Sequence, residues 1–259
     1  MSPGANRPNA TRIESVTPGS RPGVLLTASL VLVVQGLLAR SVRAAEKPDG
    51  DRPEPPKLEL GAGAGIAERT SKQRNVSYAP GLVWSGHATV VVLPYLGFRI
   101  SGGMEYHAVH LDPGALGVAG DNETTPTIRG PHVVAQLQPM IRLMPSWEAF
   151  ALAGIAWQRF TASTISVGEP SPLLVSSRSG VVVELPFGVG TRYAFIPERM
   201  ALSLLLSMST PISDSGDLFN SRAGTSQSLR QDTGELVRVA ALPSFGTTFG
   251  VGASVDYFF

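Results

Sequence analysis

Residues 245–259 read FGTTFGVGASVDYFF, a segment in which large or apolar side chains alternate with small or polar ones. Successive side chains of a β-strand point to opposite sides, so this segment has two different faces. One face is almost wholly apolar and consists of Phe245, Thr247, Phe249, Val251, Ala253, Val255, Tyr257 and Phe259. The other consists of Gly246, Thr248, Gly250, Gly252, Ser254, Asp256 and Phe258. The pattern predicts a strand between an apolar and a polar medium.

The same alternation recurs upstream and predicts eight strands in all. Their expected ranges are 58–67, 80–93, 98–110, 131–143, 147–160, 179–195, 199–210 and 244–259. The connections alternate between long and short, and the short ones contain Pro94, Pro145 and Pro197. Short turns at one end and long loops at the other are typical of an up-and-down barrel. We therefore predict an all-β fold, an eight-stranded antiparallel up-and-down transmembrane β-barrel.

The composition of the polar face distinguishes a membrane barrel from a soluble one. A water-facing surface is expected to be rich in Lys and Glu, yet no lysine follows Lys72 and the polar face is mostly Gly, Ser, Ala and Gln. The predicted lumen therefore holds a balanced polar network of Glu59, Arg99, Glu105, Gln136, Gln138, Arg142, Glu184, Arg192 and Asp256, with His87, His107 and Glu148 as further inward candidates. We expect ion pairs and hydrogen bonds among these groups to fill the interior.

Trp147 and Trp157 lie on one face of a predicted strand, ten residues apart. At about 3.3 Å per residue and a tilt near 40°, that interval covers about 25 Å, the height of the apolar band of an outer-membrane barrel. These two residues are predicted to mark the aromatic girdles on either side of the band.

The N-terminus has the layout of an export signal. Arginines precede an apolar stretch from Val24 to Leu38, and small residues follow near Ala44 and Ala45. We predict that residues 1–45 are a cleaved signal peptide, with an uncleaved anchor as the alternative. The Pro-rich residues 46–57 are predicted to form a periplasmic segment, and residues 58–259 the barrel.

The chain resembles the small bacterial outer-membrane β-barrel proteins, the group that includes the OmpA transmembrane domain, OmpX and OmpW-like barrels. The resemblance covers residues 58–259 through the opening LELGAGAG, the alternating strands and the ending VDYFF. It implies export to the bacterial outer membrane and contact with outer-membrane lipid. It also implies that Val255, Tyr257 and Phe259 form the sorting signal for the outer-membrane insertion machinery.

The residues favour a non-enzymatic role in which the barrel anchors surface loops for envelope structure or surface interaction. One alternative is a narrow channel or transporter for small or apolar solutes, and a second is a lipid A-modifying barrel enzyme. No catalytic set, cofactor or metal site is predicted: the glycines of residues 61–65 lack the helix of a dinucleotide loop, and the four histidines are accompanied by no cysteine and only scattered acids. A net charge of +1 gives no reason to expect nucleic acid, and the oligomeric state stays open.

Overall fold

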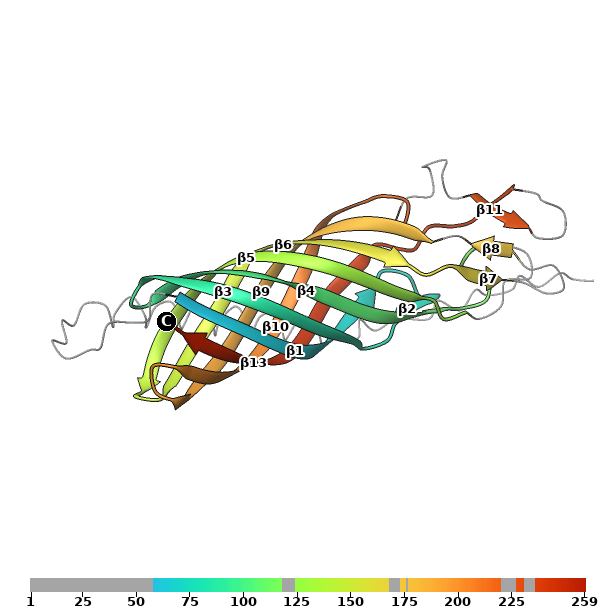
Figure 1. Ribbon diagram of the computed structural model, residues 1–259. Coiled ribbons are helices and arrows are strands. Elements are labelled where there is room, and N and C mark those ends of the chain that lie inside the picture. Colours follow the sequence, from blue (N-terminus) through green and yellow to red (C-terminus); the bar gives the residue numbers. More distant parts are fainter. Residues whose placement is uncertain (1–57, 118–123, 168–172, 176, 220–226, 231–235) are drawn as a thin grey trace, which may run out of the picture.

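The computed structural model describes residues 58–117, 124–167, 173–175, 177–219, 227–230 and 236–259. Within these ranges, eight long strands form an antiparallel barrel (Figure 1). They are β1 (Leu58–Ser71), β3 (Gly81–Leu93), β4 (Leu96–Leu111), β5 (Thr127–Met144), β6 (Trp147–Ala162), β9 (Arg178–Ile196), β10 (Met200–Ser215) and β13 (Phe245–Phe258). The all-β fold class is thereby confirmed. The predicted signal peptide and Pro-rich segment lie outside the described residues.

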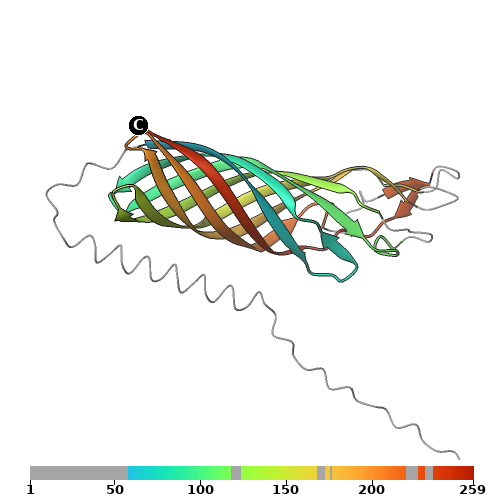
Figure 2. The same ribbon diagram turned by 90° about the horizontal axis from the view of Figure 1, so that it is seen from below.

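The barrel closes where the first strand meets the last. β1 pairs with β3 on one side and with β13 on the other, as Figure 2 shows for the blue and dark red strands. The unbroken register with β13 runs from Glu59 opposite Phe258 to Arg69 opposite Thr248. Every neighbouring pair around the barrel is antiparallel, and the closing pair leaves no free strand edge.

The short connections and both ends of the barrel lie at one end of the molecule, which we call the turn end (Figure 1). Pro94, Pro145 and Pro197 stand in the turns after β3, β5 and β9, where proline cannot disturb a strand ladder. The amide of Phe259 donates to the carbonyl of Leu58 at 2.9 Å, which joins the two ends of the barrel. The long connections lie at the opposite end, the loop end.

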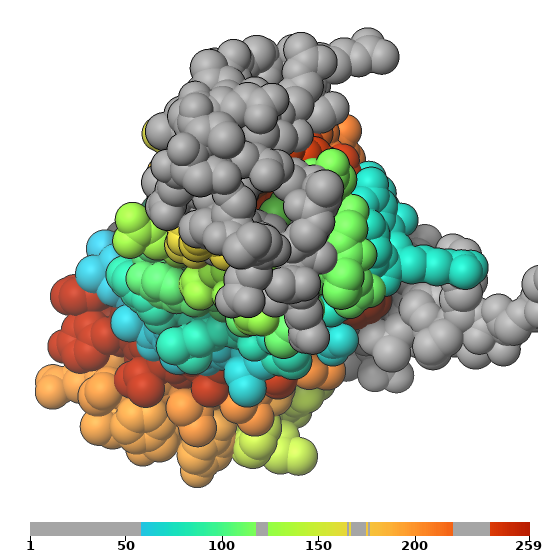
Figure 3. Space-filling model, turned by 90° about the vertical axis from the view of Figure 1, so that its right-hand side faces the viewer, coloured from blue at the N-terminus to red at the C-terminus, as the bar shows by residue number. Residues whose placement is uncertain are grey.

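The long connections contain strands that the sequence did not predict. The first holds β2 (Val76–Tyr78), which pairs with the end of β4. The third and fourth hold β7 (Ile165–Val167), β8 (Leu173–Val175), β11 (Gln227–Arg230) and β12 (Leu236–Arg238), which form a separate small sheet in the order β12-β11-β8-β7. Figure 3 views the molecule from this loop end. The first two long connections also contact each other, because the amide of Asp112 in the second donates to the carbonyl of Asn75 in the first.

The outer surface of the barrel carries a broad apolar belt. Leu204 and Val251 are 53% and 52% exposed, and the exposed aliphatic side chains include Leu60, Ile66, Leu82, Ile100, Val133, Leu137, Ile155, Leu202, Leu206 and Val255. Aromatic side chains border the belt: Trp147 and Tyr193 lie near the turn end, and Trp84, Tyr106 and Trp157 lie further toward the loop end. Within the described residues, no helix has the length and hydropathy to span a bilayer.

An apolar cluster, here called the plug, fills the interior at the loop end. Its members come from the loops and from the inner faces of the long strands, and they are Val76, Tyr78, Val109, Leu111, Leu116, Ile128, Phe160, Val175, Val182, Leu218, Val239, Leu242 and Phe245. Phe245 packs edge-to-face on Tyr78, Phe160 and Phe219, with ring centroids 4.7 to 5.1 Å apart. This corrects the prediction that Phe245 faces outward.

The physical reason is an irregularity in the closing pair. Arg69 faces Thr248 but Ser71 faces Phe245, so β13 advances three residues while β1 advances two. Such a bulge reverses the alternation, and both Thr248 and Phe245 are therefore buried.

The turn between β9 and β10 contains a non-glycine residue with a positive φ, Glu198. The amide of Arg199 donates to the carbonyl of Ile196 at 3.1 Å, which closes the turn. Glu198, which directly follows Pro197, has a φ of 61°. A turn with proline followed by a positive φ favours glycine at the second position. Glu198→Gly is therefore expected to raise the free energy of unfolding by about 0.5 to 1 kcal/mol.

Denaturant unfolding in detergent micelles measures this change. Glu198→Ala is the matched control, because it removes the same side chain and retains the unfavourable φ. An equal gain from both variants would contradict the backbone explanation.

Candidate functional site in the barrel interior

The buried polar side chains gather in two groups along the barrel. The loop-end layer comprises Arg69, Glu105, His107, Gln158, Glu184 and Ser209. The turn-end layer comprises Glu59, His87, Arg99, Glu148, Arg192, Ser203 and Asp256. The layers are separated by six residues on β4, from Arg99 to Glu105, and by ten on β1, from Glu59 to Arg69, which is about 15 to 25 Å of strand height.

Arg69 is the centre of the loop-end layer. Its Nε donates to Glu105 Oε1 at 2.6 Å, its Nη1 donates to Glu184 Oε1 at 2.7 Å and its Nη2 donates to Gln158 Oε1 at 2.8 Å. Its guanidinium carbon lies 4.7 Å from the ring centroids of both Phe160 and Phe245. The buried guanidinium of Arg69 thus contacts both the carboxylates of the loop-end layer and two aromatic rings of the plug.

His107 adds further contacts to this layer. Its Nδ1 lies 3.0 Å from the carbonyl oxygen of Ala79, and its Nε2 contacts Glu105 Oε1. Both ring nitrogens of His107 thus face acceptor oxygens. Arg69, Gln158 and Ser209 supply further donors to the carboxylates of Glu105 and Glu184, as burial of charge requires.

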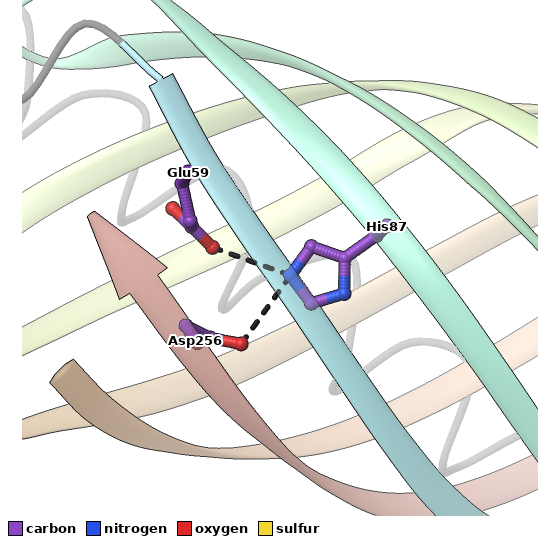
Figure 4. Close-up of side chains that lie close together, drawn as sticks. All are labelled: Glu59, His87 and Asp256. Atoms are coloured by element: carbon purple, nitrogen blue, oxygen red, sulfur yellow. Dashed lines mark hydrogen bonds and ion pairs between the residues drawn. The ribbon is translucent and has the colours of Figure 1, made fainter. Parts of the chain in front are cut away.

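The turn-end layer is organised around His87 (Figure 4). Nε2 of His87 lies 3.3 Å from Glu59 Oε1 and 3.3 Å from Asp256 Oδ1, while Nδ1 lies 2.8 Å from Arg99 Nη2. A guanidinium can only donate, so Nδ1 accepts from Arg99 and the ring proton resides on Nε2, directed at the two carboxylates. Arg192 completes the network, with Nη2 at 2.6 Å from Glu59 Oε1 and Nε at 3.4 Å from Asp256 Oδ2.

Glu59, His87 and Asp256 are also the residue types that could hold a metal ion, with ligand atoms within 4.8 Å of one another. A metal on Nε2 of His87 would move the ring proton to Nδ1, where it would meet an N–H of Arg99. Arg192 already binds Glu59. The surrounding donors therefore favour a hydrogen-bonded ionic network at this position over a metal centre.

The inward positions between the layers are mostly small or apolar. On β1 they are Gly61, Gly63, Gly65 and Ala67, and β13 adds Gly250 and Gly252. Opposite them, Phe150, Leu152 and Met140 form a buried cluster to which Val91 and Leu205 add apolar surface. Among the described residues, no side-chain hydrogen bond or ion pair joins one layer to the other.

The structure buries most residues that the sequence placed in the lumen: Glu59, Arg99, Glu105, Gln136, Gln138, Glu184, Arg192 and Asp256. Arg142 is different, since its side chain is 45% exposed at the turn end and reaches Glu148 only at 3.5 Å. It belongs to the rim because it stands near the end of β5. The residues of the expected sorting signal and girdle, Val255, Tyr257, Phe259, Trp147 and Trp157, are all exposed on the outside.

Two central residues were missed by the sequence analysis, Arg69 and Gln158. Arg69 lies beyond position 67, where the first strand was expected to end, although the odd-numbered inward positions that begin at Glu59 lead directly to it. Gln158 is the inward neighbour of the outward Trp157, and the alternation alone could have identified it.

Gly61 shows how tightly the turn-end layer is packed. A Cβ atom at this position would lie 2.3 Å from Cε1 of His87 and 2.5 Å from Oδ1 of Asp256. Gly61→Ala is therefore expected to displace His87 and to lower the free energy of unfolding by about 1 to 3 kcal/mol. Denaturant titration in micelles measures the loss.

Gly86→Ala is the control, because a Cβ there would meet only the carbonyl oxygen of Gly61 at 3.7 Å. It should leave stability nearly unchanged. Equal effects of the two substitutions would show that loss of a glycine, and not contact with His87, determines the result.

Comparison with known proteins finds solved structures of similar architecture. No family model matches the chain, and neither does any curated protein. The chain is similar to a major outer membrane protein from Thermus thermophilus, with 13% identity, a TM-score of 0.46 and coverage of 77% of this chain and 99% of that one. Neisserial surface protein A shows 12% identity, a TM-score of 0.45 and coverage of 78% and 97%.

The attachment invasion locus protein Ail of Yersinia pestis shows 9% identity, a TM-score of 0.44 and coverage of 78% and 97%. These values describe a likeness in architecture and transfer no activity. The class that the coordinates themselves define is a closed eight-stranded antiparallel barrel with an apolar exterior and an ionic interior.

Proposed function

We propose that this chain is an outer-membrane β-barrel whose role is non-enzymatic and is performed by the loops that it holds at the cell surface. The apolar belt supports the membrane assignment, because a soluble protein does not expose rows of leucine, valine and tryptophan of this extent. Backbone pairing agrees, since a closed sheet satisfies its amides without water. The loop end then faces outside the cell and the turn end the periplasm.

The filled interior is the observation that carries the proposal. Two ionic layers occupy the lumen, apolar and small residues lie between them, and the plug fills the loop end. A water-filled pore would need a polar path past all of these groups. A barrel closed in this way favours an anchor over a narrow channel or transporter.

The loop end supports a role in surface interaction. Connections of this length without structure of their own would be mobile appendages, but here two of them form a four-stranded sheet and others contribute to the plug. An ordered platform of this kind suits recognition of another surface. A lipid A-modifying activity has no comparable support among the described residues.

The C-terminal strand supports the proposed route of assembly. Val255, Tyr257 and Phe259 present one exposed apolar face at the turn end, and Tyr257 and Phe259 stack edge-to-face with centroids 4.7 Å apart. We propose that the insertion machinery of the outer membrane reads this face, with cleavage of residues 1–45 preceding it.

Planar-bilayer recording tests the closed lumen. The purified, folded barrel is expected to give no discrete conductance steps, with an open porin at the same concentration as the positive control. Steps in the wild-type protein that change amplitude in Glu184→Gln would contradict the proposal and favour a conduit. Mass spectrometry of lipid A from expressing cells is expected to show no new species, and a new species would favour an enzyme.

A further inference from the structure

Two arginines stand on the outer surface of the barrel just beyond the apolar belt. Arg129 on β5 and Arg159 on β6 are both exposed, and their strands are neighbours. Arg129 faces Thr161, so Arg159 occupies the diagonal position on the adjacent strand. Diagonal residues on one face of an antiparallel pair lie about 7–8 Å apart, a distance that long side chains readily bridge.

Their height relative to the belt follows from the register. Arg159 comes two residues after the outward Trp157, which places it about 5 Å nearer the loop end. Arg129 is paired with Tyr106, another exposed aromatic residue. Aromatic side chains of this kind mark the boundary between hydrocarbon and headgroups. Both guanidinium groups therefore lie at the level of the outer headgroups.

Neither arginine has a counter-ion in the described part of the chain. The ion pairs there involve Arg69, Arg142 and Arg192, whereas Arg129 and Arg159 form none. The comparable outward positions on β1 and β10 carry Glu68 and Thr210, so these two strands add no positive charge at this height. A cation at an apolar boundary is stabilised by an anion from outside the protein.

We propose that Arg129 and Arg159 form a binding site for the phosphate groups of a phosphorylated lipid in the outer leaflet. Guanidinium groups bind phosphate oxygens through paired, charge-assisted hydrogen bonds, and Trp157 and Tyr106 contact the adjoining acyl region. This site rests on the proposed membrane location. It goes beyond that location by naming the lipid chemistry and the side of the barrel that recognises it.

Native mass spectrometry of the full barrel in mild detergent tests the site. The probes are bis-phosphorylated lipid A and the same lipid after removal of its phosphates. The wild-type protein is expected to retain the phosphorylated form preferentially, and Arg129→Gln/Arg159→Gln is expected to bind it about tenfold more weakly. Arg74→Gln/Arg199→Gln, which removes two exposed arginines outside the β5–β6 rim, should bind like wild type.

Two further measurements separate the outcomes. Arg129→Lys/Arg159→Lys retains both charges and loses the paired geometry, so it should bind with intermediate strength. Inorganic pyrophosphate at the lipid concentration should not displace the lipid, because the site also uses the acyl boundary, and full displacement would indicate a soluble phosphate site instead. Equal wild-type binding of the two lipid forms would overturn the proposal even if the glutamine variant failed to fold.

The membrane assignment is checked separately on the same samples. A closed barrel migrates faster before boiling than after boiling on a detergent gel, and it inserts into lipid vesicles. Failure of the wild-type protein in both assays would contradict the proposed function. Success in both without a preference for phosphate would contradict the lipid site alone.

Discussion

Replacing Arg69 by methionine is expected to lower the free energy of unfolding by about 3–5 kcal/mol, the usual cost of removing one partner from a buried ionic network. The side chain is 1% exposed, and it pairs with both Glu105 and Glu184. Without it, two carboxylates face only His107, Gln158 and Ser209 in a water-poor interior. Methionine fills much of the volume, so the loss reports mainly on charge.

Urea titration of the protein in detergent micelles measures the change, with the heat-dependent gel shift as an independent measure of folded protein. Arg74→Met is the matched control, because that arginine is exposed in the turn after β1, and its effect should stay within about 0.5 kcal/mol. Adding Glu105→Gln to Arg69→Met should recover part of the stability, since it removes one unpaired charge. A loss below about 1 kcal/mol for Arg69→Met would refute the central place of this residue.

Leu204→Arg is expected to make folding into a bilayer less favourable by about 2–4 kcal/mol, as charged residues do on the lipid face near the midplane of a membrane barrel. Leu204 is exposed on β10 between Leu202 and Leu206, four residues from the start of the strand at Met200. At about 3.3 Å per residue and a tilt near 40°, it lies about 10 Å above Met200, which pairs with the exposed aromatic residue Tyr257. An arginine there must reach through hydrocarbon to find water.

Refolding from urea into lipid vesicles measures this effect. If Leu204 faced water instead of lipid, the same substitution at this exposed site would cost almost nothing. Thr210→Arg on the same strand is the control, because it lies nearer the loop end and is expected to cost only about 0–1 kcal/mol. Equal costs at the two positions would contradict a depth-dependent apolar environment. That result would remove the basis for calling the exposed belt a lipid-facing surface.

The sequence predicted the barrel well because its main signal is local. Alternation along each strand identified all eight long strands, and the turns with Pro94, Pro145 and Pro197 set their order. A period of two needs no knowledge of distant neighbours, since it follows from the strand geometry alone. The closed antiparallel sheet followed from the even number of strands and the contrast between short and long connections.

Most of the errors lie at the loop end, where the local signal ends. Phe245 was placed outside because a bulge in the closing pair cannot be recognised from one strand. Arg69 was missed because a charged, polar segment after Ala67 was taken for a loop, yet its charge is compensated by Glu105 on β4 and Glu184 on β9. The small sheet depends on pairings between distant connections, for which a single sequence gives little indication.

The candidate site was predictable in composition but not in arrangement. Inward residues such as Glu59, Arg192 and Asp256 could be predicted because every second side chain of a strand faces the interior. Their division into two layers could not be foreseen, because it depends on the tilt and the stagger of all eight strands. Arg142 illustrates this limit. It occupies an inward position in the alternation of β5, but it lies too near the end of the strand to be enclosed.

The middle segment of glycine, alanine and leucine that separates the two layers has an evolutionary consequence. Because the guanidinium of Arg69 and that of Arg192 share no partner, the two sets of charges can exchange residues without adjusting to each other. A substitution among the charges around Arg69 therefore requires no compensating substitution around Arg192, where Asp256 holds the closing strand.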